Sequence, residues 1–316
     1  WLFQAPNGRI FHAGPSRWMH WIDLGGVDEE GSFEKAGLRE DPNFPGGDEA
    51  VDQMSGNAAM FEAGKILIVG GAPKYDMGTP ATAKTYIVDI NGDEPVVTRS
   101  GDMSVPRTFS NLVVLPTGEV MVIGGMPAAH QFSDKDSHFH CEIWNPDTGK
   151  WRIESSILVP RNYHSTAILT KDGRIFAGGG GLCGPNCGDA NHLDAQIFSP
   201  SYLFDSNRQS GMALRPRLLT YPSIIEPDEV IEIKTSDYEQ GQEFVLIRLS
   251  AVTHSTNNDQ RRLVLEKWRQ RGKDFKLKMP NKNVLLPGTY FMYVIDRFGT
   301  PSVGYTVVYD LGNHDL

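Results

Sequence analysis

The sequence is poor in positive charge and in long hydrophobic runs, and each shortage excludes a class of protein. Lys and Arg number 30 against 39 Asp and Glu, for a formal charge of −9. A partner with a phosphate backbone is excluded, because its binding needs clustered basic residues. The apolar runs are far shorter than the ~20 residues that a membrane-spanning helix needs. The sequence therefore predicts neither a nucleic-acid-binding protein nor an integral membrane protein.

Cysteine is scarce as well, with three residues in the chain. Cys183 and Cys187 stand four positions apart in a loop rich in glycine, where they can close a small disulfide. Such a bond would indicate an oxidising, extracellular compartment, whereas the alternative is two free thiols in a cytosolic loop. Cys141 lies in an apolar segment and is predicted to be a small core residue.

A start methionine and a signal peptide are also lacking, since the sequence begins at Trp1. We therefore expect a processed product or a fragment of a longer protein. Glycine and proline, in contrast, are plentiful, with 33 and 20 residues. This abundance indicates many turns between short strands.

A repeat runs through the first two thirds of the chain. Residues 107–125 and 161–179 lie 54 positions apart and share a starting Arg, a central turn with glycine and a final Gly-Gly. Residues 57–71 and, more weakly, 1–14 follow the same pattern. Each copy predicts two strands joined by a hairpin turn, and a third strand follows at an interval. These third strands are expected at 85–90, 142–144 and 195–198.

A unit of about 50 residues with a glycine doublet is typical of a kelch-type blade of a β-propeller. Residues 1–204 would hold about four blades, and we expect N-terminal blades to be missing from this chain. A polar linker is predicted at 205–212, and residues 213–316 alternate in the manner of an immunoglobulin-like β-sandwich. The fold class is thus all-β. The strands expected in the sandwich are 230–235, 243–249, 262–266, 275–279, 288–295 and 303–309.

Two segments depart from these patterns and contain candidate functional residues. Tyr163 and His164 stand where the sister repeats have Phe109-Ser110 and Ser55-Gly56. Adjacent residues in a regular strand point to opposite faces, so both side chains can reach one site only at the start of a strand or at a bulge. The second place is the polar loop 250–261 with His254, for which a solvated hairpin tip is the alternative.

These segments resemble the galactose oxidase-like copper radical oxidases. The motifs are Arg161-Asn-Tyr-His-Ser, Asp172-Gly-Arg-Ile-Phe-Ala-Gly-Gly-Gly-Gly-Leu-Cys, Asn191-His-Leu-Asp-Ala-Gln and Thr253-His-Ser-Thr-Asn-Asn-Asp-Gln. The resemblance covers the whole chain. It implies a seven-bladed propeller, a loop of the C-terminal domain that rises through its channel, and one copper ion.

On this resemblance, His164 and His254 would be the equatorial copper ligands and Tyr163 the axial ligand. Tyr163 would also be the base that takes the proton of the substrate hydroxyl. Tyr75, Asp76 and Phe132 would line the substrate pocket, although plain loop packing is an alternative for Phe132.

The resemblance also implies parts that the chain lacks. The radical tyrosine cross-linked to a cysteine, its covering tryptophan and a sugar-binding arginine belong to blades before Trp1. Asp76 replaces the glutamine of galactose-oxidising members, which puts galactose in doubt as the substrate. We therefore expect a secreted oxidase that converts a primary alcohol to an aldehyde and O2 to H2O2, with this chain inactive alone.

Two alternatives remain open. The chain would otherwise be a non-catalytic extracellular module that binds carbohydrate or protein, because propeller scaffolds commonly bind without chemistry. A rival metal site is the pair His138 and His140, which would share one face of a strand. His192 is expected to be a hydrogen-bonded structural residue between blades.

Overall fold

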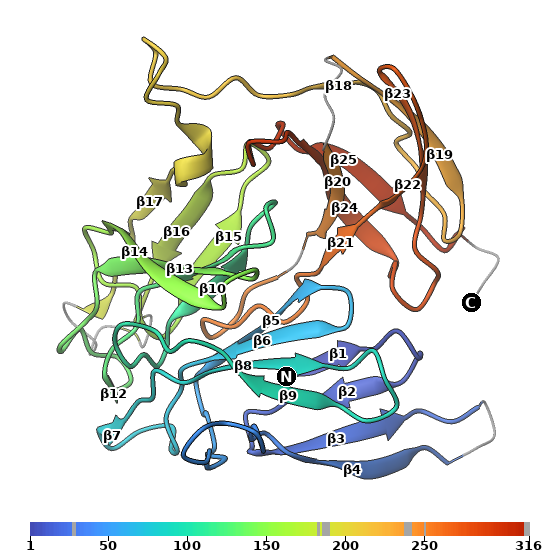
Figure 1. Ribbon diagram of the computed structural model, residues 1–316. Coiled ribbons are helices and arrows are strands. Elements are labelled where there is room, and N and C mark those ends of the chain that lie inside the picture. Colours follow the sequence, from blue (N-terminus) through green and yellow to red (C-terminus); the bar gives the residue numbers. More distant parts are fainter. Residues whose placement is uncertain (27–29, 182–183, 185–189, 237–241, 250, 313–316) are drawn as a thin grey trace.

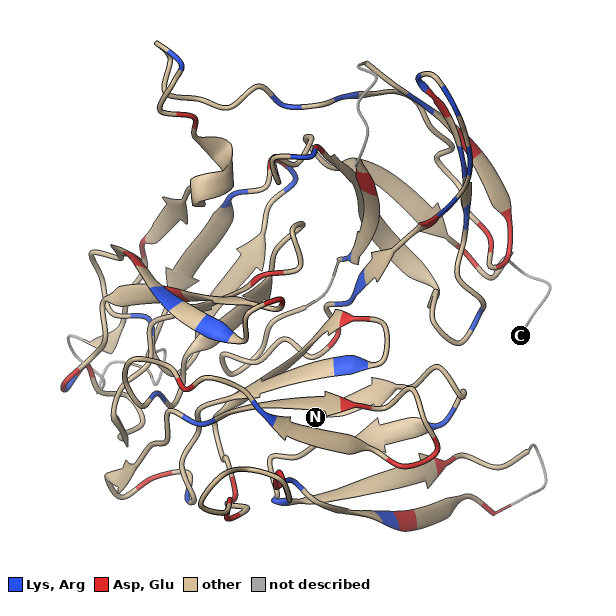
Figure 2. Ribbon diagram, viewed as in Figure 1, with Lys and Arg blue, Asp and Glu red and all other residues tan. Residues whose placement is uncertain are grey.

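The computed structural model describes residues 1–26, 30–181, 184, 190–236, 242–249 and 251–312. Within these ranges the regular structure is mainly β-sheet, and a 3-10 turn lies at Ser201–Leu203 (Figure 1). The described part contains no helix with the length and hydrophobicity of a membrane span. Acidic and basic residues are interspersed along the strands of both halves of the molecule (Figure 2).

Four antiparallel sheets follow one another along the first 198 residues, and the innermost strands of the last three, β5, β10 and β15, are neighbours. The first three sheets have four strands and the fourth has three. A two-stranded sheet joins loops of the second and third blades. The strands are β1 (Leu2–Gln4), β2 (Ile10–His12), β3 (Trp18–Asp23), β4 (Ser32–Leu38), β5 (Asn57–Glu62), β6 (Lys65–Val69), β7 (Thr79–Pro80), β8 (Thr85–Asp89), β9 (Val96–Arg99), β10 (Asn111–Val114), β11 (Val120–Ile123), β12 (Ala128–Ala129), β13 (His140–Asn145), β14 (Lys150–Ser156), β15 (Ser165–Leu169), β16 (Ile175–Gly179) and β17 (Ala195–Phe198).

The glycine doublets of the repeat lie where the next blade passes closest. A Cβ on Gly70 would lie 2.4 Å from the carbonyl oxygen of Arg107, and one on Gly124 would lie 1.9 Å from that of Arg161. Both glycines have positive φ, of 62° and 70°, which side chains rarely adopt. The first glycine of each of these doublets is therefore required by the close approach of the next blade, whereas the second, Gly71 or Gly125, lies against the turn of its own blade.

The arginines that start the last two repeats are buried and tied to their own blades. Arg107 donates to the carbonyl of Gly124 at 2.6 Å and pairs with Glu142 at 3.0 Å. Arg161 donates to the carbonyl of Gly179 at 2.9 Å and pairs with Asp194 at 3.0 Å. Hydrophobic clusters fill the spaces between successive sheets, so polar anchors and apolar layers alternate around the arc.

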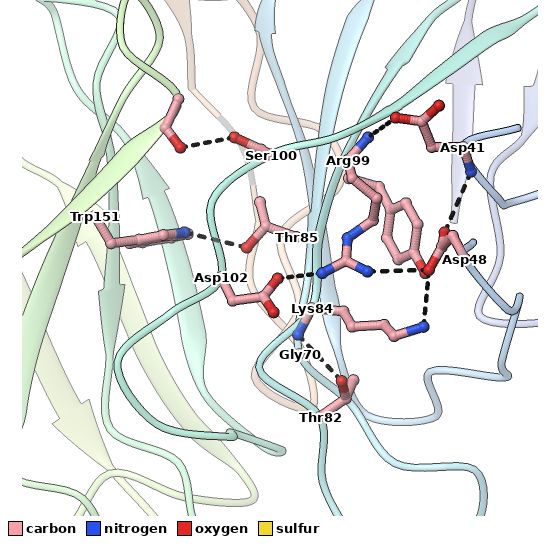
Figure 3. A network of polar contacts seen from close by, with 12 residues as sticks. Asp41, Asp48, Gly70, Thr82, Lys84, Thr85, Arg99, Ser100, Asp102 and Trp151 are labelled. Carbon is pink, nitrogen blue, oxygen red and sulfur yellow. Dashed lines mark hydrogen bonds and ion pairs between the residues drawn. The ribbon is translucent and has the colours of Figure 1, made fainter. Parts of the chain in front are cut away.

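The loop before the second blade is held by a polar network around Asp48 (Figure 3). Its buried carboxylate accepts from Lys84 at 2.9 Å and from Arg99 at 3.0 Å. Arg99 also pairs with Asp102 and donates its backbone N–H to Asp41. The network fixes the outer edge of this blade and lies apart from the residues considered below.

The C-terminal part is a sandwich of two four-stranded sheets, ordered β18-β19-β23-β22 and β21-β20-β24-β25. One apolar cluster fills the space between them and includes Phe244, Phe275 and Tyr290. The strands are β18 (Leu218–Thr220), β19 (Val230–Thr235), β20 (Glu243–Arg248), β21 (Arg262–Val264), β22 (Glu266–Arg271), β23 (Asp274–Lys278), β24 (Gly288–Ile295) and β25 (Tyr305–Tyr309).

The structure differs from the sequence prediction at several strands, and β3, β7, β12 and β18 were not among those expected. The strand expected at 262–266 is broken at Leu265, so that β21 and β22 belong to opposite sheets. The outer strands β4, β9 and β14 were not predicted. Their residues are mostly exposed or half-buried, because an edge strand has a neighbour on one side only, and hydrophobic periodicity is weak there.

A segment of the sandwich, residues 251–262, runs along the innermost strands of the blades. The side-chain amide of Gln260 pairs with the β10 backbone, donating to Leu112 O at 2.7 Å and accepting from Val114 N at 2.9 Å. Arg261 donates to the carbonyl of Gln4 at 2.9 Å. We refer to residues 251–262 as the inserted segment, and it brings His254 to the blades.

Candidate metal centre

Tyr163 and His164 lie in a tight turn directly before β15. Ser165 N–H donates to Asn162 O at 2.9 Å and closes the turn, and His164 has a φ of 65°. The sister repeats have the positive φ at Ser55 and Phe109, one position earlier in the alignment. The turn has thus moved by one residue in the last blade. Outside a strand, the two rings do not point apart but stack, with centroids 4.0 Å apart.

His254 lies at the tip of a two-residue hairpin in the inserted segment. Thr253 and Thr256 exchange two backbone hydrogen bonds, of 3.0 and 2.9 Å, around His254 and Ser255. Both tip residues have positive φ, 52° and 63°, as a type I′ turn requires. The sequence lacks the Asn-Gly that usually stabilises such a turn, so contacts with the blades must hold it. Asn57 supplies one by donating to the carbonyl of Ser255 at 2.8 Å.

The predicted ligands converge from these two turns. The ring centroids of His164 and His254 are 5.1 Å apart, and the Tyr163 ring lies 5.8 Å from that of His254. Each imidazole uses Nδ1 for a hydrogen bond, to the carbonyl of Gly181 at 2.6 Å and with the hydroxyl of Thr253 at 2.7 Å. No hydrogen bond to either Nε2 is found among the described residues. Two oriented imidazoles beside a phenol are a donor set that fits Cu(II).

Aromatic rings surround Tyr163. Tyr75 and Phe132 pack edge-to-face against it with centroids 5.8 and 5.1 Å away, and Phe109 does so at 5.2 Å. Burial, followed by the interaction with the neighbouring phenol of Tyr163, raises the pKa of Tyr75. Tyr75 therefore stays protonated beside the Tyr163 ring.

The residues predicted to line the pocket differ in their contacts with Tyr163 and His164. Phe132 is 36% exposed while it touches both Tyr163 and His164, so it closes the site on one side and faces solvent on the other. Asp76 is exposed, and its carbonyl accepts from Thr79. Phe109 was not predicted to be a site residue, because a phenylalanine within a repeat is typical of a hydrophobic core.

The rival pair His138 and His140 does not form a common site. Their rings are 5.8 Å apart, and Nε2 of each is used elsewhere, with Pro106 O at 3.1 Å and Ser104 Oγ at 3.2 Å. Burial is the main cause that lowers the pKa of both imidazoles, and the positive charge of Arg107 is the second. The same charge would repel a metal cation at this place.

The remaining predictions have mixed outcomes. His192 is a hydrogen-bonded residue between blades, as expected, since its Nε2 lies 2.9 Å from Asp134. Cys141 is fully buried, and burial raises the pKa of its thiol to about 12. Cys183 and Cys187 lie outside the described residues, so their disulfide stays a prediction.

Two family descriptions match the chain. "Glyoxal oxidase N-terminus" matches residues 38–198, and "Galactose oxidase-like, Early set domain" matches residues 215–308. The two matches agree with the order of blades and sandwich. They confirm the predicted fold class, an all-β chain with kelch-type blades followed by an immunoglobulin-like sandwich.

Individual relatives extend these matches. A galactose oxidase from Gibberella zeae is 36% identical over 314 residues, which cover 97% of this chain and 44% of that protein. An aldehyde oxidase from Arabidopsis thaliana is 25% identical over 84% of this chain and 49% of its own length. A fungal alcohol oxidase of the AA5 family, solved in complex with copper, has a TM-score of 0.88 and 36% identity, over 98% of this chain and 63% of that one. The chain thus spans less than half the length of these two curated relatives.

Proposed function

The chain belongs to the galactose oxidase-like copper radical oxidases, and on this premise we propose that the protein oxidises a primary alcohol, a galactose-like sugar or another, to an aldehyde. The alcohol loses two electrons and two protons, and O2 takes up all four to become H2O2. Copper is the proposed cofactor of this chain. The fungal alcohol oxidase solved with copper supports this choice, at 36% identity over nearly the whole chain.

One observation carries the proposal: Tyr163, His164 and His254 meet from two separate parts of the fold. Bound there, copper would supply Lewis acidity and accept one electron. The two imidazoles would hold it through Nε2, because their Nδ1 atoms are occupied. The Tyr163 oxygen would take the proton of the substrate hydroxyl, with the Tyr75 ring packed beside it.

The second redox group is proposed to lie outside these 316 residues. The family uses a tyrosine cross-linked to a cysteine, and Cys141 is unsuited to that chemistry because it is fully buried in a core. Further blades, in the same polypeptide or in another chain, would supply that group. We accordingly expect these residues alone to bind copper without turning over substrate.

The substrate is proposed to be a primary alcohol whose identity depends on an aromatic wall and one acidic residue. Tyr75 and Phe132 offer apolar ring surface beside Tyr163. Asp76 stands at the glutamine position of galactose-oxidising members, so an alcohol other than galactose is favoured. We also propose that the protein is secreted, on the basis of the family resemblance and the predicted disulfide of Cys183 and Cys187.

The first test is to titrate Cu(II) into the 316-residue chain and to measure bound copper together with peroxide released from galactose and simple primary alcohols. Copper bound at one ion per chain, without peroxide, is the expected result. Full-length protein loaded with copper should then release peroxide. Absence of peroxide with a broad panel of alcohols would refute the proposed activity.

A double substitution separates this proposal from the non-catalytic binding module. Tyr163→Phe with His164→Ser places the residues of the preceding repeat at the centre. The oxidase should lose copper binding, whereas a carbohydrate- or protein-binding module should keep its ligand. The single substitution His192→Gln is a matched control, because His192 is not a proposed ligand and should leave copper binding intact.

A further inference from the structure

Asn162, the residue before Tyr163, contacts three separate segments of the molecule. It is 5% exposed. Its side chain reaches the loop that carries Phe132, and its backbone carbonyl reaches both the turn before β15 and the hairpin of His254. Asn162 therefore contacts both turns that carry the proposed copper ligands and the loop that forms one wall of the proposed substrate pocket.

The side-chain amide holds the Phe132 loop, residues 131–137. Nδ2 donates to the carbonyl of Ser133 at 3.1 Å and to the hydroxyl of Ser137 at 2.7 Å. A second tether lies farther out, where Asp134 pairs with His192 at 2.9 Å. Phe132 itself has a φ of 53°, a conformation that surrounding contacts must maintain.

The carbonyl of Asn162 holds the two copper turns. It accepts from Ser165 N–H at 2.9 Å and from the Ser165 hydroxyl at 2.6 Å. It also accepts from the buried Ser255 hydroxyl at 2.9 Å, which ties down the residue after His254. Asn162 contributes only its backbone carbonyl to these bonds. A change of its side chain therefore leaves that acceptor in place.

The last blade has an amide side chain at this position of the repeat, and the preceding blade does not. The equivalent residue one repeat earlier is Thr108, which is fully buried and makes one long side-chain contact, 3.4 Å to Ser55 O. Among the described residues, the buried Oδ1 of Asn162 has no hydrogen-bond partner. The side-chain bonds that Asn162 makes are thus the two that its Nδ2 donates to the Phe132 loop.

We propose that Asn162 is a positioning residue that sets the Phe132 wall of the pocket against Tyr163, and that its side chain thereby determines how tightly the alcohol is held. The pocket assignment rests on the proposed function. The link between Asn162 and the loop does not depend on it. The amide belongs to the residue next to Tyr163. Its bonds to the loop therefore fix the distance between the Phe132 wall and Tyr163, the proposed base.

The test uses Asn162→Asp in the full-length, copper-loaded protein. This near-isosteric change replaces the donor that faces Ser133 O with an acceptor and keeps the backbone carbonyl. Amide exchange at Lys135 and Ser137 should become about 10-fold faster, roughly the factor of one lost hydrogen bond. KM for the alcohol should rise by about the same factor, while kcat and copper affinity stay within about 3-fold. Thr108→Ala is the matched control and should change neither the exchange nor KM.

Three outcomes decide the matter. Unchanged exchange at Lys135 and Ser137 would overturn the proposal, and so would a loss of copper affinity and kcat at constant KM. If wild-type protein bound no copper or released no peroxide, the proposed function would fail, and amide exchange would still decide whether Asn162 holds the loop. If Asn162→Asp does not fold, Ser137→Ala removes one half of the tether and should give a smaller rise in the same exchange rates.

Discussion

Replacing His164 with glycine should separate copper binding from folding. His164 has a φ of 65°, and a side chain in this left-handed region costs about 1–2 kcal/mol, which glycine avoids. The substitution removes the hydrogen bond to Gly181 O, of about 1 kcal/mol, and the stacking on Tyr163, of about 1 kcal/mol. The gain and the losses nearly cancel. The free energy of unfolding of metal-free protein should therefore change by about 1 kcal/mol or less.

Copper binding should respond quite differently to the same substitution. His164 is one of two proposed imidazole ligands, and loss of even an outer partner of a ligand costs about 10–100-fold in metal affinity. His164→Gly should thus weaken copper binding by more than about 100-fold. The assays are urea unfolding of metal-free protein and calorimetric titration with Cu(II).

Ser55→Gly is the matched control, because Ser55 has a φ of 55° in the corresponding turn two blades earlier, and its buried hydroxyl has no hydrogen-bond partner among the residues that the structure describes. It should raise the free energy of unfolding by about 1 kcal/mol and leave copper binding unchanged. A fall of more than about 3 kcal/mol in His164→Gly would refute the reasoning on strain and show that the imidazole is a packing residue. Unchanged copper affinity would refute its assignment as a ligand.

Three further predictions follow from particular contacts. Gln260→Ala should lower the free energy of unfolding by about 2–4 kcal/mol in urea unfolding, because it leaves two buried backbone groups of β10 without partners; a loss below about 1 kcal/mol would mean that water replaces the amide. Tyr75→Phe removes the hydroxyl that neighbours the Tyr163 phenol and should weaken copper binding by about 10-fold in titration, with fold stability nearly constant. Burial lowers the pKa of His12 to about 4, so as the pH falls from 6.5 to 4 the unfolded chain takes up a proton that the folded chain does not. The free energy of unfolding should fall by about 1–2 kcal/mol across this window, and His12→Gln should abolish that part of the pH dependence.

Much of the fold was predictable because it depends on local patterns. The 54-residue repeat located the inner strands of the blades, and 195–198 and 288–295 were predicted with the bounds that β17 and β24 have. The glycine doublets were also visible, since backbone packing between blades admits no side chain there. The break in the repeat at Tyr163 and His164 marked the candidate centre, because a structural position keeps the same kind of residue in every copy.

The sequence by itself therefore determined the fold class and the residue types of the centre. The tertiary structure decided which of them meet. The one-residue shift that stacks Tyr163 on His164 depends on a turn closed at Asn162, and no residue type signals such a shift. His254 reaches the centre because Gln260 and Asn57 bind its segment to strands far away in the sequence. These are contacts between distant parts of the chain, and local hydrophobic periodicity carries no information about them.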